Sequence, residues 1–188
     1  MELSDTSLKT AASPPQKTLY ANIMIFLICG EKNEGKTTRL KRIFPTVKNA
    51  YGFAAEKVFE DDTLVAYKLV DLRSGVGIPL AQICTGPDGC TDESFAHGAF
   101  CFNTAGFAWA RGIFEAARMA DADAFFLDEV GRMELGARGH SKLLRAALKS
   151  DMDIYMTVRN SSIKDVIREF EIENYIRIRA RRQAMERF

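Results

Sequence analysis

The fold of this chain can be inferred from one segment, Gly30-Glu31-Lys32-Asn33-Glu34-Gly35-Lys36-Thr37. It fits the pattern G-x-x-x-x-G-K-[ST], in which a glycine-rich loop binds the phosphates of a nucleotide. Residues 23–29, immediately upstream, are apolar throughout, as in a parallel strand buried on both faces. Residues 37–44, downstream, are predicted to form a helix. This order of strand, loop and helix is the context that the pattern requires.

The residue types in the loop predict its chemistry. Gly30 and Gly35 allow a tight turn that directs backbone N–H groups toward phosphate oxygens at a helix N-terminus. Lys36 supplies a cation for the β- and γ-phosphates, and the Thr37 hydroxyl is a predicted Mg²⁺ ligand. A chance match is the alternative, and the flanking strand and helix argue against it. The predicted nucleotide-binding residues are Gly30, Glu31, Lys32, Asn33, Glu34, Gly35, Lys36, Thr37 and Thr38.

A second apolar run, Ala124-Phe125-Phe126-Leu127-Asp128-Glu129, ends in two carboxylates. If it forms a strand, both acids lie at its carboxyl end, where open α/β sheets bind their ligands. Asp128 is predicted to hold Mg²⁺ through its water shell, and Glu129 to take a proton from an attacking water. An acidic pair that merely ends a strand at the surface is the alternative. The neighbouring phosphate loop favours the functional interpretation.

Length and charge limit the remaining possibilities. The chain has 188 residues, which suggests one domain, predicted over residues 21–180. Residues 1–20 are predicted to be a disordered N-terminal tail, and residues 181–188 a basic C-terminal tail. With 26 basic and 25 acidic residues the net charge is +1, so no clear nucleic-acid surface is expected. Nothing in the sequence indicates a protein partner.

No segment has the ~20 consecutive apolar residues of a membrane span, and no signal peptide is recognisable. We therefore expect a cytoplasmic protein with no membrane association. The four cysteines, at positions 29, 84, 90 and 101, suggest no disulfide framework and are expected to be reduced. Cys84, Cys90 and His97 are a weak candidate for a zinc site, because a C-x-x-C pair and a fourth ligand are missing. A surface loop is the favoured interpretation of this segment.

The region between the two motifs has a β-rich pattern. Residues 58–59 and 64–70 flank the polar turn Glu60-Asp61-Asp62-Thr63 and predict a β-hairpin. Residues 78–83 and 99–102 predict two further short strands. A helix is expected from Asn103 or Thr104, as its cap, to about Met119.

After Glu129 the pattern alternates between helix and strand. Helices are expected around 143–148 and over 163–170, and strands over 154–158 and 175–178. The predicted fold class is therefore α/β, with a doubly wound, mainly parallel sheet and a β-hairpin insertion.

The acidic segment continues as Asp128-Glu129-Val130-Gly131-Arg132-Met133-Glu134-Leu135, which matches the pattern D-E-[IV]-G-x-M-E-L of a known family. With Gly35-Lys36-Thr37-Thr38-Arg39-Leu40 and the Gly52-Phe53 segment, it makes the chain resemble the cancer-related nucleoside-triphosphatase family. These are small P-loop NTPases with a RecA-like sheet. The resemblance covers about residues 22 to 178.

The resemblance implies Mg²⁺-dependent hydrolysis of nucleoside triphosphates (ATP, GTP and others) to diphosphates, with loose base specificity. It implies the roles already given to Lys36, Thr37, Asp128 and Glu129. The chain departs from the family in its loop, where Asn33 and Glu34 replace small residues, and in its hairpin turn, where acids replace glycine and arginine.

Phosphoryl transfer to water also needs a cation for the charge that develops on the γ-phosphate. Arg159 and Arg132 are both candidates, and Arg159 is the predicted catalytic residue. A small nucleotide or metabolite kinase is an alternative function, but the segment 71–103 has only Arg73 to build an arginine-rich lid. A nucleotide-dependent switch or accessory protein, such as one for cofactor or metal-centre assembly, remains a third possibility.

Overall fold

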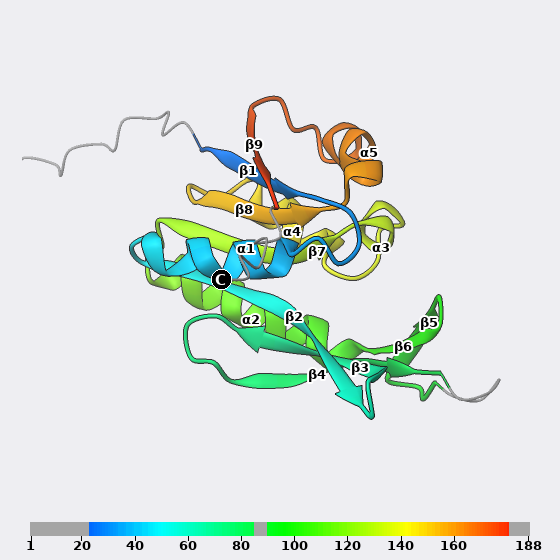
Figure 1. The fold of residues 1–188 in the computed structure, drawn as a ribbon. Coiled ribbons are helices and arrows are strands. Elements are labelled where there is room, and N and C mark those ends of the chain that lie inside the picture. Colours follow the sequence, from blue (N-terminus) through cyan, green and yellow to red (C-terminus); the bar gives the residue numbers. More distant parts are fainter. Residues whose placement is uncertain (1–22, 85–89, 181–188) are drawn as a thin grey trace, which may run out of the picture.

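The computed structural model describes residues 23–84 and 90–180, and all nine strands of this part form one sheet (Figure 1). Their order is β5-β6-β4-β3-β2-β7-β8-β1-β9. The tails predicted for residues 1–20 and 181–188 lie outside the described residues. The strands are β1 (Ile25–Cys29), β2 (Ala50–Glu60), β3 (Thr63–Asp71), β4 (Gly77–Ile83), β5 (Ser94–His97), β6 (Phe100–Asn103), β7 (Ala124–Val130), β8 (Asp153–Val158) and β9 (Tyr175–Arg179).

Helices cover both faces of this sheet. The first helix packs its apolar side on one face, and the longest helix, α2, packs on the other together with α4 and α5 (Figure 1). This is the doubly wound arrangement that the sequence predicts. The helices are α1 (Lys36–Ile43), α2 (Thr104–Met119), α3 (Arg132–Leu135), α4 (Ser141–Ala147) and α5 (Ile163–Glu169), with short 3₁₀ turns η1 (Phe44–Thr46) and η2 (Asn160–Ser162).

The parallel half of the sheet contains the strands that end at the predicted site. The order β2-β7-β8-β1-β9 is parallel throughout. In β1, Leu27 and Ile28 point to opposite faces and both are fully buried, because helices lie on each side. The uniformly apolar sequence of this strand is thereby explained.

The predicted hairpin is present, but it is not a separate insertion. β2 pairs in parallel with β7 over Ala50–Phe53 and then antiparallel with β3 from Phe53 to Glu60. One strand thus belongs to both halves of the sheet. At its tip, Asp61 and Asp62 both have positive φ (44° and 61°), the conformation of a two-residue hairpin turn.

Two details of the β-rich half extend the sequence prediction. The expected strands at 78–83 and 99–102 are β4 and β6, and an unpredicted strand, β5, pairs with β6 at the sheet edge. α2 begins as expected, since the side chain of Asn103 accepts a 2.8 Å hydrogen bond from the N–H of Ala105.

No helix in residues 23–84 or 90–180 is long and apolar enough to cross a membrane.

The close approach of β2 to β7 depends on Gly52. Its φ is +148°, and a Cβ there would collide with the backbone of Phe126. Only glycine fits this position without displacing β7, the strand that carries Asp128.

Candidate functional site

The phosphate-loop sequence connects β1 to α1 and has the backbone conformation that its glycines predict. Gly35 has φ 84°, in the left-handed region, and its carbonyl accepts a 2.8 Å hydrogen bond from the N–H of Arg39 at the start of α1. Asn33 also has positive φ (66°), which asparagine tolerates better than most residues. The loop therefore delivers the chain into the N-terminus of a helix, as phosphate binding requires.

Lys36 is the first residue of α1, and its side chain is buried. Its Nζ donates a 2.8 Å hydrogen bond to the carbonyl oxygen of Glu31, so the ammonium group lies across the loop. Glu34 also folds over the loop: its Oε2 accepts a 2.7 Å hydrogen bond from the N–H of Glu31. A carboxylate oxygen thus occupies one of the backbone donors on which the phosphate prediction depends.

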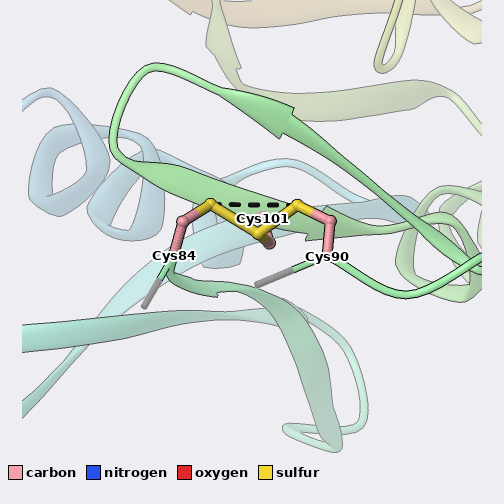
Figure 2. A group of neighbouring side chains, drawn as sticks. All are labelled: Cys84, Cys90 and Cys101. Atoms are coloured by element: carbon pink, nitrogen blue, oxygen red, sulfur yellow. Dashed lines mark hydrogen bonds between the residues drawn. A yellow bond between two sulfur atoms is a disulfide. The ribbon is translucent and has the colours of Figure 1, made fainter. Parts of the chain in front are cut away.

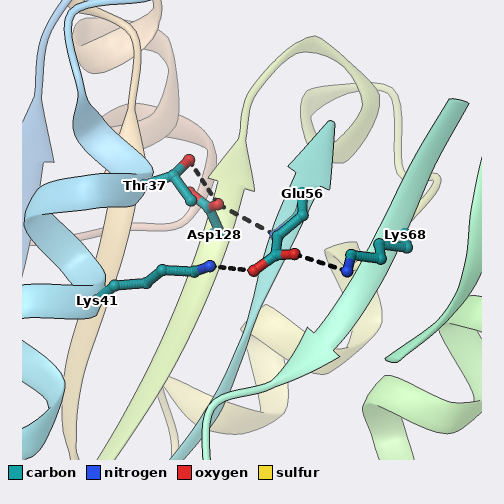
Figure 3. Close-up of polar contacts among 6 residues, drawn as sticks. Thr37, Lys41, Glu56, Lys68 and Asp128 are labelled. Atoms are coloured by element: carbon teal, nitrogen blue, oxygen red, sulfur yellow. Dashed lines mark hydrogen bonds and ion pairs between the residues drawn. The ribbon is translucent and has the colours of Figure 1, made fainter. Parts of the chain in front are cut away.

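Asp128 connects the loop helix to the middle of the sheet (Figure 3). Its Oδ2 accepts a 2.8 Å hydrogen bond from the Thr37 hydroxyl and a 3.1 Å bond from the N–H of Ala55. Only 1% of the Asp128 surface is exposed, so these bonds form away from water. The two residues that the sequence assigns to Mg²⁺ are therefore direct neighbours.

The other oxygen of Asp128 is held by Thr157 in β8. The Thr157 hydroxyl donates a 2.6 Å hydrogen bond to Oδ1 of Asp128 and accepts a 2.8 Å bond from the N–H of Glu129. This fully buried threonine was not predicted from the sequence. Its position near the end of a predicted parallel strand, beside that of Asp128, is the signal that points to it.

Burial raises the pKa of Asp128 to about 6, and the nearby Glu129 charge acts in the same direction. Hydrogen bonds from Thr157, Thr37 and Ala55 favour the ionised form and limit the rise. The hydrogen-bond partners found in the described part of the chain are hydroxyl and N–H groups and include no cation. A buried carboxylate beside a hydroxyl is an all-oxygen donor set that suits Mg²⁺, whose charge would favour ionisation.

Glu129 has an unusual backbone conformation for a residue in a strand. Its φ is 62°, and the pairing of β7 with β8 shifts register between Leu127 and Val130. Left-handed backbone at a non-glycine residue costs about 1–3 kcal/mol and persists only where the surroundings impose it. The result is that Glu129 is exposed while Asp128 and Val130 on either side are buried.

Arg159 directly follows β8 and is exposed at the same edge of the sheet. The charges of Arg159 and Glu129 both act on the pKa of Tyr67 in β3. Burial is the main reason that the pKa of Tyr67 is raised; the Glu129 charge raises it further and the Arg159 charge lowers it. Both charges therefore act on one phenol. Arg132, the other candidate, is the exposed first residue of α3.

The rest of the acidic motif builds the turn after Glu129. The buried Glu134 side chain accepts hydrogen bonds from the N–H groups of Gly131 (2.9 Å) and His140 (3.2 Å). Burial raises the pKa of Glu134 to about 7 despite these bonds. The His140 ring is buried and packs against Phe53 and Phe107, at centroid distances of 4.7 and 4.9 Å.

The Gly52-Phe53 segment also contributes to the site through its backbone. Glu56 forms ion pairs with Lys41 on α1 and with Lys68 on β3 (Figure 3). These two lysines lower the pKa of Glu56. Glu56 directly follows Ala55, so these ion pairs lie next to the hydrogen bond from the Ala55 N–H to Asp128.

Three features define the class of P-loop NTPases, here with a RecA-like sheet: a glycine-rich loop that enters a helix, a buried lysine, and a hydroxyl bonded to an aspartate in β7, with β8 between β7 and the loop-bearing β1. A family model described as NTPase matches residues 25–183. The chain belongs to this NTPase family.

Comparisons with individual proteins agree with this assignment. The chain is 27% identical to the nucleoside-triphosphatase THEP1 of Thermotoga sp. (strain RQ2) over 141 residues, which are 74% of this chain and 76% of the relative. It is 28% identical to THEP1 of Pyrobaculum calidifontis over 146 residues, 76% of this chain and 78% of the relative.

Two solved structures share the fold. The crystal structure of THEP1 from Aquifex aeolicus superposes with a TM-score of 0.66 and 21% identity, over 87% of this chain and 93% of that one. The solution structure of a human cancer-related nucleoside triphosphatase gives a TM-score of 0.60 and 20% identity, over 83% and 88% of the two chains. The RecA-like P-loop fold predicted from the sequence is thereby confirmed.

Proposed function

We propose that this protein hydrolyses nucleoside triphosphates to diphosphates and phosphate in an Mg²⁺-dependent reaction with loose base specificity. The observation that carries the proposal is the hydrogen bond from Thr37 to Asp128, next to an exposed Glu129. This hydrogen bond connects the helix of the phosphate loop to the second predicted Mg²⁺ ligand. The proposed general base, Glu129, is the next residue in the same strand. The names of the THEP1 relatives support the hydrolytic activity.

In the proposed reaction, the backbone N–H groups of the loop and the Lys36 ammonium bind the phosphates. Thr37 and Asp128 would hold Mg²⁺, which when bound neutralises charge on the β- and γ-phosphate oxygens. Thr157 keeps the Asp128 carboxylate in place, since it holds the oxygen that Thr37 does not bind.

Glu129 accepts a proton from the water that attacks the γ-phosphorus, and the nucleoside diphosphate leaves as the bond to the bridging oxygen breaks. The exposure of Glu129 leaves its carboxylate accessible to that water. Arg159 offsets the charge that develops on the transferred group. Loose base specificity follows from the proposed contacts, because loop N–H groups recognise phosphate and not the base.

The test is phosphate release by purified protein with Mg²⁺ and each of ATP, GTP, CTP and UTP, compared with Lys36→Ala. The proposal predicts release from several nucleotides, loss of release with a chelator, and loss of both binding and release in the variant. Full binding and hydrolysis by Lys36→Ala would contradict the phosphate-loop assignment.

The same assay separates the proposal from a nucleotide-dependent switch or a kinase. Either alternative predicts tight nucleotide binding with negligible release by the protein alone. Release that then rises only when a partner protein or a phosphate acceptor is added would favour the alternative over a dedicated hydrolase.

A further inference from the structure

Three of the four cysteines meet at the far end of the β-rich half of the sheet (Figure 2). Cys84 directly follows β4, Cys101 lies in β6, and Cys90 precedes β5. Their sulfur atoms all lie within 4.8 Å of one another. Cys101 is buried and the other two are half-buried. The prediction that the cysteines form no disulfide framework is wrong for these three, because Cys101 lies within bonding reach of both Cys84 and Cys90.

Strand pairing explains why the sulfurs meet. Gln82 in β4 is opposite Cys101 in β6, and the N–H of Cys84 donates a 3.0 Å hydrogen bond to the carbonyl of Ala99. Side chains alternate along a strand, so Cys84, two residues after Gln82, lies on the same face as Cys101. The Cα of Cys101 is 5.4 Å from that of Cys84 and 5.5 Å from that of Cys90.

His97 is not part of this cluster, although it is the third ligand that the sequence suggests. It is opposite Phe100 in the β5–β6 pair, and its ring packs against Phe102 at a centroid distance of 6.2 Å. Both phenylalanines alternate with Cys101 along β6 and lie on the other face of the sheet. Cys101 takes the place that the sequence gives to His97.

A single disulfide does not account for the arrangement. The Cα of Cys101 is close enough to the Cα atoms of both Cys84 and Cys90 for a disulfide, whereas one sulfur atom can form only one such bond. Either disulfide would leave the third cysteine as a free thiol in contact with the disulfide. A metal ion bound by three thiolates uses all three sulfurs at once.

The spacing of the two outer sulfurs also suits a metal ion. Cys84 Sγ and Cys90 Sγ are 3.8 Å apart. Tetrahedral zinc with Zn–S bonds of ~2.3 Å separates its sulfur ligands by about 3.8 Å. Cys84 and Cys90 are therefore already placed as two corners of a tetrahedron. The Cys101 sulfur lies between them, and its side chain would have to turn away from the ion's position to form the third corner.

We propose that Cys84, Cys90 and Cys101 form a binding site for one thiophilic divalent metal ion, best matched by Zn²⁺. The described residues supply three ligands, which leaves the fourth tetrahedral position for water or an added ligand. This site is separate from the nucleotide site: strands β4 and β6 lie beyond β3 and β2 from the loop-bearing β1. Its metal would tie β4 to β6 and to the start of β5.

The first test is metal content. Protein purified under reducing conditions is loaded with Zn²⁺, freed of excess ion, and analysed beside Cys101→Ser and the control Cys29→Ala, whose residue is a buried free cysteine in β1. We expect one equivalent of Zn²⁺ in the wild type and in Cys29→Ala, and none in Cys101→Ser. Replacement by Co²⁺ should give the intense near-ultraviolet absorption of thiolate-to-cobalt charge transfer.

Cys84→Ser and Cys90→Ser, at less buried positions, cover the case in which Cys101→Ser fails to fold. Each should lose stoichiometric Zn²⁺ binding while keeping the circular dichroism of the wild type. Titration of thiols in denaturant, after metal removal, separates the remaining outcomes. Four reactive thiols without metal binding would overturn the proposal. So would two thiols and a mass lower by two hydrogen atoms in protein purified without reductant, in this case in favour of a disulfide.

Discussion

The Thr157 hydroxyl in β8 holds both residues of the acidic pair: it donates to Asp128 Oδ1 at 2.6 Å and accepts from the N–H of Glu129 at 2.8 Å. A single buried side chain thus fixes the carboxylate proposed for Mg²⁺ and the backbone of the proposed base. We therefore expect Thr157 to be a positioning residue for hydrolysis.

Thr157→Val keeps the shape of the side chain and removes both hydrogen bonds. We expect the maximal rate of phosphate release to fall about 10- to 100-fold, as for other residues that orient metal ligands. The free energy of unfolding should fall by about 2 kcal/mol, because buried polar groups lose their partner. Thr157→Ser, which keeps the hydroxyl, is the control and should retain most of the activity. Equal activity in all three proteins would refute this role.

Glu34 should weaken nucleotide binding, since its carboxylate accepts the Glu31 N–H and brings negative charge to the phosphate loop. Removing this charge in Glu34→Ala is worth about 1 kcal/mol, or about fivefold tighter binding of a non-hydrolysable nucleotide. The gain should shrink at high salt. Glu60→Ala, which removes an exposed acid at the end of β2, is the matched control and should leave affinity unchanged. Weaker binding by Glu34→Ala would mean that Glu34 supports the loop.

His140 makes folding stability depend on pH. Burial lowers the pKa of His140 to about 3, with a smaller contribution from Arg111, and its Nδ1 has no hydrogen-bond partner. The unfolded chain, with a pKa near ~6.5, then binds a proton that the folded chain excludes. The contribution of neutral His140 to the free energy of unfolding is therefore complete above pH ~6.5 and decreases as pH falls toward 3.

The variant His140→Phe removes this proton and keeps an aromatic ring between Phe53 and Phe107. Its stability relative to the wild type should rise by about 2 kcal/mol between pH 8 and pH 5. Denaturant unfolding at the two pH values measures this difference. The variant keeps the backbone N–H of residue 140, which donates to Glu134. Titration of the Glu134 carboxyl therefore contributes equally to the stability of both proteins. A difference that does not vary with pH would show that folding does not lower the pKa of His140.

Gly52 is required by the packing of β2 on β7, because a Cβ would overlap the backbone of Phe126. Gly52→Ala should lower the free energy of unfolding by at least about 3 kcal/mol. Gly112→Ala is the control: it lies within α2 with nothing within 4 Å of the added Cβ, and should be neutral or stabilise by up to about 1 kcal/mol. Similar melting temperatures for the two variants would be inconsistent with this packing.

Local sequence predicted those parts of the molecule that depend on near neighbours in the chain. The loop at 30–37, the strand ending at Asp128 and the Asn103 cap each depend on residues within one segment. Their types follow from turn chemistry and hydrophobic pattern.

Features that join distant segments were not predicted. Thr157 reaches Asp128 only because β7 and β8 pair in one register, and Tyr67 approaches the site only because β2 carries β3 with it. Cys101 joins Cys84 for the same reason, through pairing of β6 with β4. The sequence offers no local pattern for a register, so these contacts had to come from the structure.

Single-turnover phosphate release from ATP by Glu129→Gln in excess decides whether Glu129 is the general base of a nucleoside triphosphatase. Nucleotide affinity of the variant is measured in parallel. The account predicts affinity within about twofold of the wild type and release slower by about 100-fold or more. An unchanged release rate with intact binding would contradict it.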